Sequence, residues 1–161
     1  MGINISMHTQ FLQQTIDLAN ENVIHHNGGP YGAIIVKQGE VIAASGNRVT
    51  ADIDPTAHAE VMAIRLACKA LNDFKLTGCI LYTSCEPCPM CLGAIYWARL
   101  DKVFFACNRF DAAKAGFDDS FIYDEIPLQP EKRRIAMLHI ALADAQKPFI
   151  AWNIQEGKTQ Y

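Results

Sequence analysis

The sequence predicts an α/β protein in which helices pack against a sheet. Short β-rich runs alternate with segments of helical periodicity along the 161 residues, an order that typically gives a layered fold. Hydrophobic residues make up 50% of the chain, enough for one core, and charged residues only 19%, which argues against disorder. We see no repeat, low-complexity segment or linker in the sequence and therefore predict a single domain over residues 1–161.

The first third of the chain predicts a helix followed by a hairpin. Apolar residues recur with a period close to 3.6 over residues 9–22, which predicts an amphipathic helix that ends at the Asn27-Gly28-Gly29-Pro30 turn. Residues 33–36 and 41–44 are two short β-rich runs around Gln38-Gly39. Such a pair of runs around a glycine turn predicts a β-hairpin.

The middle of the chain predicts two helices and two buried strands. Asp54-Pro55 is expected to open a helix, because Asp can cap a helix and Pro suits its first turn. A second helix is expected from Pro89 to about Ala98. Residues 79–83 and 102–106 are short apolar runs, typical of strands that are covered on both faces.

The last part of the chain leaves one assignment open. Residues 135–143 are apolar almost throughout, and periodicity alone does not separate a strand from a helix there. Pro148 is expected to begin a final helix that ends before Gly157 and leaves a short tail ending in Tyr161.

Composition narrows the function classes. The net charge of −3 and the pI of about 5.9 lack the basic excess of a nucleic-acid-binding protein, so no nucleic-acid partner is expected. The start of the chain is polar and no apolar run reaches about 18 residues, so neither a signal peptide nor a membrane partner is expected and a cytoplasmic location is favoured. The six cysteines form no disulfide framework. Cys68, Cys79 and Cys107 are expected in the core.

Two short motifs carry the chemistry. His58-Ala59-Glu60 precedes Pro87-Cys88-Pro89-Met90-Cys91, a pattern typical of zinc-dependent nucleobase deaminases. His58, Cys88 and Cys91 offer one imidazole and two thiolates, and three protein ligands leave a zinc ion one open position. Glu60 is then placed to shuttle protons while a zinc-activated hydroxide replaces an amino group on a flat heterocycle.

A structural zinc site is the main alternative for these cysteines. A structural site needs four ligands, and Cys85 is near enough in sequence to be the fourth. A zinc ion with four protein ligands would have no open position for water, and Glu60 would then have no water to deprotonate. Because residues two apart in a helix point about 200° away from each other, His58 and Glu60 can converge only at a helix start. Glu86 is expected to hold a loop through backbone hydrogen bonds, and Tyr31 and Trp97 could be core aromatics or surfaces on which a base stacks.

The sequence also resembles a known family over nearly its whole length. It is similar to the bacterial guanine deaminases of the cytidine-deaminase-like superfamily at residues 28–32, 54–61, 81–99 and 115–123 and at the terminal Tyr161. The zinc motif marks the superfamily, and the Gly-Phe-Asp-Asp-Ser block at 116–120 with the terminal tyrosine marks the guanine branch. The resemblance implies a three-layer αβα sandwich around a central five-stranded mixed sheet, with residues 135–141 as a strand. It also implies a homodimer that exchanges the C-terminal segments, about residues 145–161.

The same resemblance implies an activity and a set of site residues. It implies zinc-dependent hydrolysis of guanine to xanthine and ammonia, a step of purine catabolism, with Glu60 as the proton shuttle. Asn47, Asp119 and Tyr161 match residues that contact the base, the last of them contributed by the other subunit. Tyr31 departs from the phenylalanine of close relatives but keeps an aromatic face. A tRNA adenosine deaminase, a cytosine-type deaminase and a zinc-binding module without catalysis are the alternatives.

Overall fold

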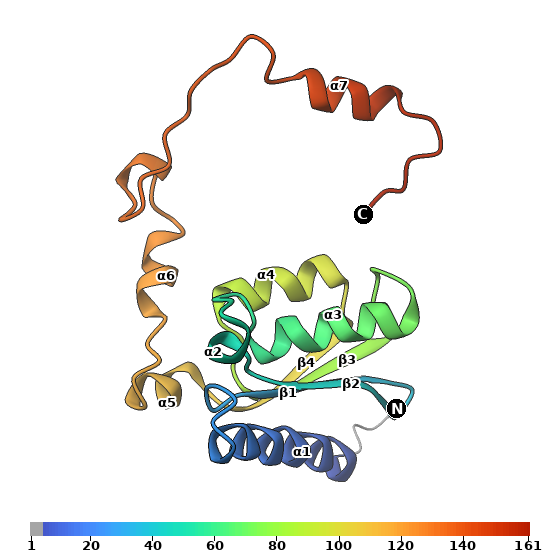
Figure 1. Cartoon of the computed structure of the whole chain (residues 1–161), viewed down its shortest axis with the longest axis vertical. Helices are drawn as coiled ribbons and strands as arrows, with labels where there is room; N and C mark the ends of the chain where they lie inside the picture. The colour runs from blue at the N-terminus through green and yellow to red at the C-terminus, as the bar shows by residue number, and fades with distance from the viewer. Residues whose placement is uncertain (1–4) are drawn as a thin grey trace. The chain divides into compact units, whose positions relative to one another are not determined.

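The computed structural model describes residues 5–161 and divides the chain into two compact units, the first ending at Asp119 and the second spanning Ser120–Tyr161 (Figure 1). The first unit contains most of the regular structure. Its elements are α1 (Ile5–Ile24), β1 (Gly32–Lys37), β2 (Glu40–Gly46), α2 (Val49–Asp52), α3 (Ala59–Leu71), β3 (Cys79–Cys85), α4 (Pro89–Ala98), β4 (Lys102–Cys107) and α5 (Arg109–Lys114).

One mixed sheet forms the centre of the first unit. Its strand order is β2-β1-β3-β4, with β1 antiparallel to both of its neighbours and β3 parallel to β4. The expected mixed sheet is therefore confirmed, but the expectation of five strands is wrong, because the sheet has four. Residues 135–141, the expected fifth strand, pair with no other strand among residues 5–161. A strand exists only where its backbone groups find a partner, and apolar composition alone does not supply one.

Helices cover both faces of this sheet. Helix α1 packs on one face, and α3 packs on the other with α4 beside it (Figure 1). The larger core lies between the sheet and the α3–α4 layer and includes Ile35, Ile64, Leu81 and Ile95. The smaller core lies under α1. The elements expected over residues 9–22, 33–36, 41–44, 79–83, 89–98 and 102–106 all form, with longer bounds in most cases.

Two glycine positions show how the hairpin fits under α1. A Cβ on Gly32, at the start of β1, would collide with the backbone oxygen of Thr15 in α1, so the helix and strand approach too closely for any side chain. Gln38 and Gly39 form the two-residue turn with φ values of 52° and 86°. Two positive φ values are typical of the tight turns that match the twist of a hairpin.

The start of α3 differs from the sequence prediction. Asp54 does not cap the helix directly, because its Oδ1 accepts hydrogen bonds from the backbone N–H of Thr56 (2.8 Å) and from its hydroxyl (2.7 Å). These bonds close a separate turn of the kind that Asp side chains commonly form. The helix begins only at Ala59, with His58 as its N-cap residue.

Strand β4 also differs from the prediction. It forms where expected, but it lies at the edge of the sheet and most of its side chains are exposed. Cys107, at its end, is exposed rather than part of the core, whereas Cys79 is buried and Cys68 is half-buried. The prediction for Cys107 was wrong because an apolar run does not show how many faces of a strand are covered.

The second unit contains short helices. They are α6 (Ser120–Glu125), the 3-10 helix η1 (Pro130–Lys132) and α7 (Lys147–Ile154), the last of which begins one residue before the expected Pro148. The tail folds against α7, where Lys158 Nζ donates to the backbone oxygens of Trp152 (2.8 Å) and Asn153 (2.9 Å). Across residues 5–161, no helix has both the length and the apolar character needed to cross a bilayer.

Candidate metal centre and catalytic pocket

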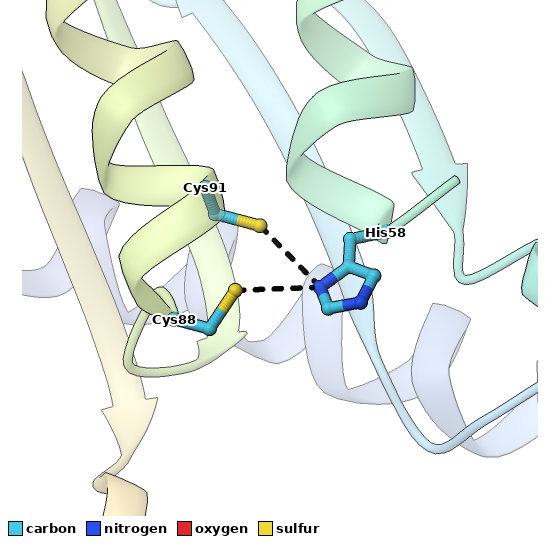
Figure 2. A group of neighbouring side chains, drawn as sticks. All are labelled: His58, Cys88 and Cys91. Carbon is cyan, nitrogen blue, oxygen red and sulfur yellow. Dashed lines mark hydrogen bonds between the residues drawn. The ribbon is translucent and has the colours of Figure 1, made fainter. Parts of the chain in front are cut away.

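The three predicted metal ligands come from the starts of two helices. His58 is the N-cap residue of α3, Cys88 is the N-cap residue of α4, and Cys91 lies in the first turn of α4. Neither His58 nor Cys88 uses its side chain to cap its own helix. Both side chains are therefore available to each other, and Figure 2 shows the imidazole and the two thiols pointing toward one another.

The geometry of this group fits a zinc ion. His58 Nδ1 lies 3.5 Å from the sulfur of Cys88 and 3.5 Å from the sulfur of Cys91, and the ligand atoms lie within 4.8 Å of one another. Ligands about 2.0–2.3 Å from a tetrahedral zinc lie roughly 3.5 Å apart. One nitrogen and two sulfurs are also the donors that zinc prefers. The three residues would hold the ion and leave its fourth position open.

Cys85 does not complete a closed structural site. Within residues 5–161, the group that could hold a metal consists of His58, Cys88 and Cys91. The Cys85 thiol instead donates a 3.5 Å hydrogen bond to the backbone oxygen of Asn108. The four-ligand alternative therefore lacks its fourth ligand in this structure.

The two cysteines of the site share a proton. A hydrogen bond from Cys91, together with one to His58, lowers the pKa of Cys88 to about 4. The pKa of Cys91 is raised, first because its thiol proton is held by Cys88 and then because of burial. The N-terminal end of α4 carries partial positive charge, which also favours a thiolate there.

Glu60 lies beside the ligands without being one of them. It occupies the first turn of α3 and is only 4% exposed, and burial raises the pKa of its carboxyl group. Its Oε1 accepts a 3.3 Å hydrogen bond from Thr83 Oγ1, and its Oε2 accepts a 3.5 Å hydrogen bond from the Cys91 thiol. Burial disfavours the charged form of a carboxyl group and so makes it a stronger proton acceptor than an exposed one.

A cavity of about 520 Å³ opens onto Glu60, His58 and Cys88. It brings together several residues that the sequence singled out. Its lining consists of Gly29, Tyr31, Asn47, Val49, Thr50, Pro55, His58, Glu60, Cys85, Glu86, Cys88, Arg109, Ala112, Gly116, Phe117, Asp118 and Asp119.

Asn47 is fixed in the cavity wall by the backbone around it. Its Oδ1 accepts hydrogen bonds from the N–H groups of Val49 (3.2 Å) and Gly29 (3.4 Å). Its own backbone oxygen accepts a 2.9 Å bond from Asn22 Nδ2. Because the side-chain oxygen is held by the protein, the amide NH2 group is the part of Asn47 that can serve a ligand as a donor.

An aromatic pair and a carboxylate form another part of the wall. The rings of Tyr31 and Phe117 meet edge to face at 5.3 Å and 85°. Burial raises the pKa of the Tyr31 hydroxyl, and burial followed by the nearby Cys88 raises the pKa of Asp119. A flat ring and an acceptor carboxylate thus line the same cavity as Glu60.

Two predicted contact residues do not line this cavity. Trp97 lies on α4 with 66% of its surface exposed, and it is not among the lining residues of the described chain. Tyr161 belongs to the second unit, where its ring meets that of Trp152 edge to face at 6.2 Å.

The sequence interpretation overlooked other residues at the site. Thr83 was predicted only as part of a strand, although a threonine inside an apolar run was a signal that it serves a buried polar partner. Phe117 and Arg109 line the cavity and were not assigned a role. Glu86 lines it too, and its Oε2 accepts a 3.0 Å bond from the Arg109 N–H, which agrees with the loop-holding role expected of it.

The chain matches a family of zinc-dependent deaminases. The family model for the cytidine and deoxycytidylate deaminase zinc-binding region matches residues 5–107, which include all three ligands and Glu60. This protein belongs to that family. Residues 108–161 lie beyond the matched region.

One protein that is similar over nearly the full length of this chain is a guanine deaminase. The guanine deaminase of Bacillus subtilis strain 168 is 55% identical over 154 residues, covering 96% of this chain and 99% of that protein. Its X-ray structure superposes with a TM-score of 0.94 over 96% of this chain and 98% of the other. The structure of a guanine deaminase from Nitrosomonas europaea has a TM-score of 0.65 and 33% identity over 68% of this chain and 63% of the other.

Similarity to RNA-acting deaminases is confined to part of the chain. The tRNA-specific adenosine deaminase of Aquifex aeolicus is 52% identical over 77 residues, which cover 48% of this chain and 51% of that protein. The chain therefore shares about half its length with this relative. The zinc motif alone does not separate the two groups, whereas full-length similarity does.

Proposed function

We propose that this protein hydrolyses guanine to xanthine and ammonia. The observation that carries the proposal is the placement of Glu60 at a three-ligand metal site, in a cavity that also contains Asn47 and Asp119. The full-length similarity to the guanine deaminase of B. subtilis supports the same substrate. When bound, zinc supplies a Lewis acid that makes a water molecule a nucleophile near neutral pH.

Glu60 moves the protons of the reaction. Its carboxyl group takes a proton from the attacking water, passes one to a ring nitrogen and then protonates the leaving amine. Burial raises the pKa of this carboxyl group, which makes its carboxylate a stronger base toward the attacking water. Thr83 donates to Oε1 and thereby aims the carboxyl group, whereas Cys91 donates to Oε2 only in the metal-free protein, because a zinc-bound cysteine is a thiolate.

Asp119 and Asn47 select and orient the base. Guanine presents two adjacent donors, its ring N–H and its exocyclic amine, and a carboxylate such as Asp119 can accept from both. The NH2 group of Asn47 offers a donor to an acceptor atom of the purine. Adenine lacks the donor pair that Asp119 would accept. Tyr31 and Phe117 offer aromatic surface to the flat ring.

The catalytic test uses a single substitution. Zinc-loaded protein should convert guanine to xanthine, followed by the absorbance change, and Glu60→Gln should lower kcat by about 10²- to 10⁴-fold, the usual contribution of a general acid–base group. Zinc content should stay at one ion per chain in the variant. A zinc-loaded native protein that forms no xanthine would overturn the proposal, and full activity in the variant would favour a zinc module.

A substrate panel separates the remaining alternatives. Adenosine in tRNA and free cytosine should be poor substrates, and a gel shift with tRNA should show weak binding, because the chain carries a net charge of −3. Efficient deamination of tRNA with little action on guanine would replace our proposal with the RNA-acting alternative.

We further propose that the enzyme is a cytoplasmic homodimer in which segments 145–161 are exchanged, so that Tyr161 closes the pocket of the partner subunit. The proposal rests on the family resemblance and on the placement of Tyr161 in a separate compact unit. Trp97 is exposed on α4 and does not line the described cavity, and we propose it as a further aromatic contact to the base.

Mixed dimers test the exchange directly. Glu60→Ala and Tyr161→Ala should each give a weakly active protein. Co-refolding the two variants should restore activity, because half of the mixed dimer's sites would combine an intact Glu60 with an intact Tyr161 from the other chain. If each tail instead served its own subunit, every site of the mixed dimer would carry one defect and no activity would return.

A further inference from the structure

Two cysteines occupy paired positions at the ends of neighbouring strands. Cys85 is the last residue of β3 and Cys107 the last residue of β4, and the two are register partners in the parallel ladder. The pairing continues to the strand ends, because the Glu86 N–H donates a 2.8 Å hydrogen bond to the backbone oxygen of Cys107. Paired residues of neighbouring strands project their side chains to the same face of a sheet.

The spacing of these positions suits a disulfide. Neighbouring strands lie about 4.8 Å apart, and a disulfide joins residues whose Cα atoms are about 4.4–6.8 Å apart. The Cys85 thiol also reaches toward β4, since it donates to the backbone oxygen of Asn108, the residue after Cys107. The bond can therefore form with rotation of side chains and little movement of the strands.

The sulfurs of Cys85 and Cys107 differ in their exposure to solvent. Cys107 is exposed at the edge of the sheet, whereas Cys85 is buried and lines the catalytic cavity. Burial, followed by the charge of the nearby Cys107, raises the pKa of the Cys85 thiol to about 11. An oxidant from solvent thus meets Cys107 first, and Cys85 is positioned to resolve the oxidised sulfur.

We propose that Cys85 and Cys107 form a modification site, a reversible disulfide that closes when a peroxide oxidises the protein. The Cys107 thiolate attacks the peroxide oxygen, which breaks the O–O bond and gives a sulfenic acid and, with a proton, water. The Cys85 sulfur then attacks the sulfenic sulfur, and the hydroxyl group leaves with a proton as a second water. Two electrons pass from the sulfurs to the peroxide, and a thiol reductant reverses the change.

The position of the Cys85–Cys107 disulfide would affect the catalytic cavity. Cys85 directly precedes the segment that carries Glu86 and Cys88, and Cys107 directly precedes the segment that carries Arg109. The disulfide would tie together the two loops that form one side of the cavity and remove a free thiol from its wall.

Peptide mapping tests the proposal on the zinc-loaded full chain. The protein is treated with hydrogen peroxide, alkylated, and digested with trypsin without reduction. We expect a disulfide-linked pair of the peptides 76–99 and 103–109, with fragmentation placing the bond on Cys85, zinc retained, and both thiols recovered after reduction. Persistence of both free thiols, a bond from Cys107 to Cys88 or Cys91, or a link only between two chains would each overturn it.

Two variants control for non-specific oxidation. Cys107→Ser should abolish the linked peptide while leaving activity before oxidation unchanged, because Cys107 does not line the described cavity. Cys68→Ser removes a half-buried thiol on α3 and should leave the linked peptide in full yield. Loss of the linked peptide in the Cys68 variant as well would contradict the assignment.

Discussion

Thr83 Oγ1 donates a 3.3 Å hydrogen bond to Oε1 of Glu60, and both residues are buried. The bond joins the central strand β3 to the start of α3. The bond fixes the orientation of the carboxyl group, and a donor to a carboxylate favours its ionised form. Burial acts in the opposite direction and raises the pKa of Glu60.

Thr83→Val should shift the pH dependence of the reaction. Valine has a similar shape but cannot donate, so the ionised form of Glu60 loses stabilisation and its pKa rises further. The acidic limb of the kcat profile should then move to higher pH, by about one unit if the bond contributes about 1.5 kcal/mol. Zinc content should not change. If the acidic limb of the kcat profile stays in place in a variant with normal zinc content, Thr83 does not influence the pKa of Glu60.

Two cysteine substitutions should separate a three-ligand site from a four-ligand site. Cys88→Ala removes a ligand and should strongly reduce zinc content, measured by elemental analysis. Cys85→Ala should retain one zinc per chain, because Cys85 is not in the ligand group of the described residues. Loss of zinc from the Cys85 variant would support the structural-site alternative.

Zinc affinity should rise with pH. In the metal-free protein, the pKa of Cys88 is lowered to about 4 and that of Cys91 is raised above its usual 9.0, so the pair carries one proton over the range between. Zinc needs both thiolates and must displace that proton, so affinity should increase about tenfold per pH unit. At lower pH the protonation of His58, whose pKa is raised by its bond to Cys88, should steepen the dependence. Competition with a chelator from pH 5 to 8 measures how zinc affinity depends on pH. An affinity that does not change with pH would show that Cys88 and Cys91 do not hold a proton that zinc must displace.

Gly32→Ala should destabilise the first unit. Its Cβ would collide with the backbone oxygen of Thr15, and forcing such overlap typically costs about 1–3 kcal/mol. Gly93→Ala is the matched control, because a Cβ there meets no atom within 4 Å and alanine favours the helix by about 0.5–1 kcal/mol. Thermal unfolding should therefore give a lower Tm for the first variant and an equal or higher Tm for the second. A normal Tm for Gly32→Ala would show that α1 and β1 can separate freely.

Local sequence signals predicted most elements of the first unit. Periodicity located α1, the β-rich runs located β1 to β4, and Pro89 marked the start of α4. The start of α3 was misplaced because Asp54 has two uses, helix cap and turn former, and only the three-dimensional contacts of Thr56 decide between them. The unpaired segment 135–141 shows the second limit, because strand formation depends on a neighbour that composition does not reveal.

The parts of the site that depend on the separation of residues along the sequence were predictable. Cys88 and Cys91 lie one turn apart on any helix that starts at Pro89, and the requirement that His58 and Glu60 converge at a helix start is met at Ala59. Long-range contacts were not predictable. The bond from Thr83 to Glu60 and the placement of Phe117 against Tyr31 depend on packing between distant segments.

The positions of His58 and Cys88 at helix N-caps make the site sensitive to chain length as well as to residue type. Each residue added or deleted at a helix start rotates the neighbouring side chains by about 100° around the helix axis. A one-residue deletion between Asp54 and His58, or between Cys85 and Cys88, would misdirect a donor atom even with every ligand still present. Homologous enzymes that keep this chemistry should therefore vary in these segments by substitution and not by insertion.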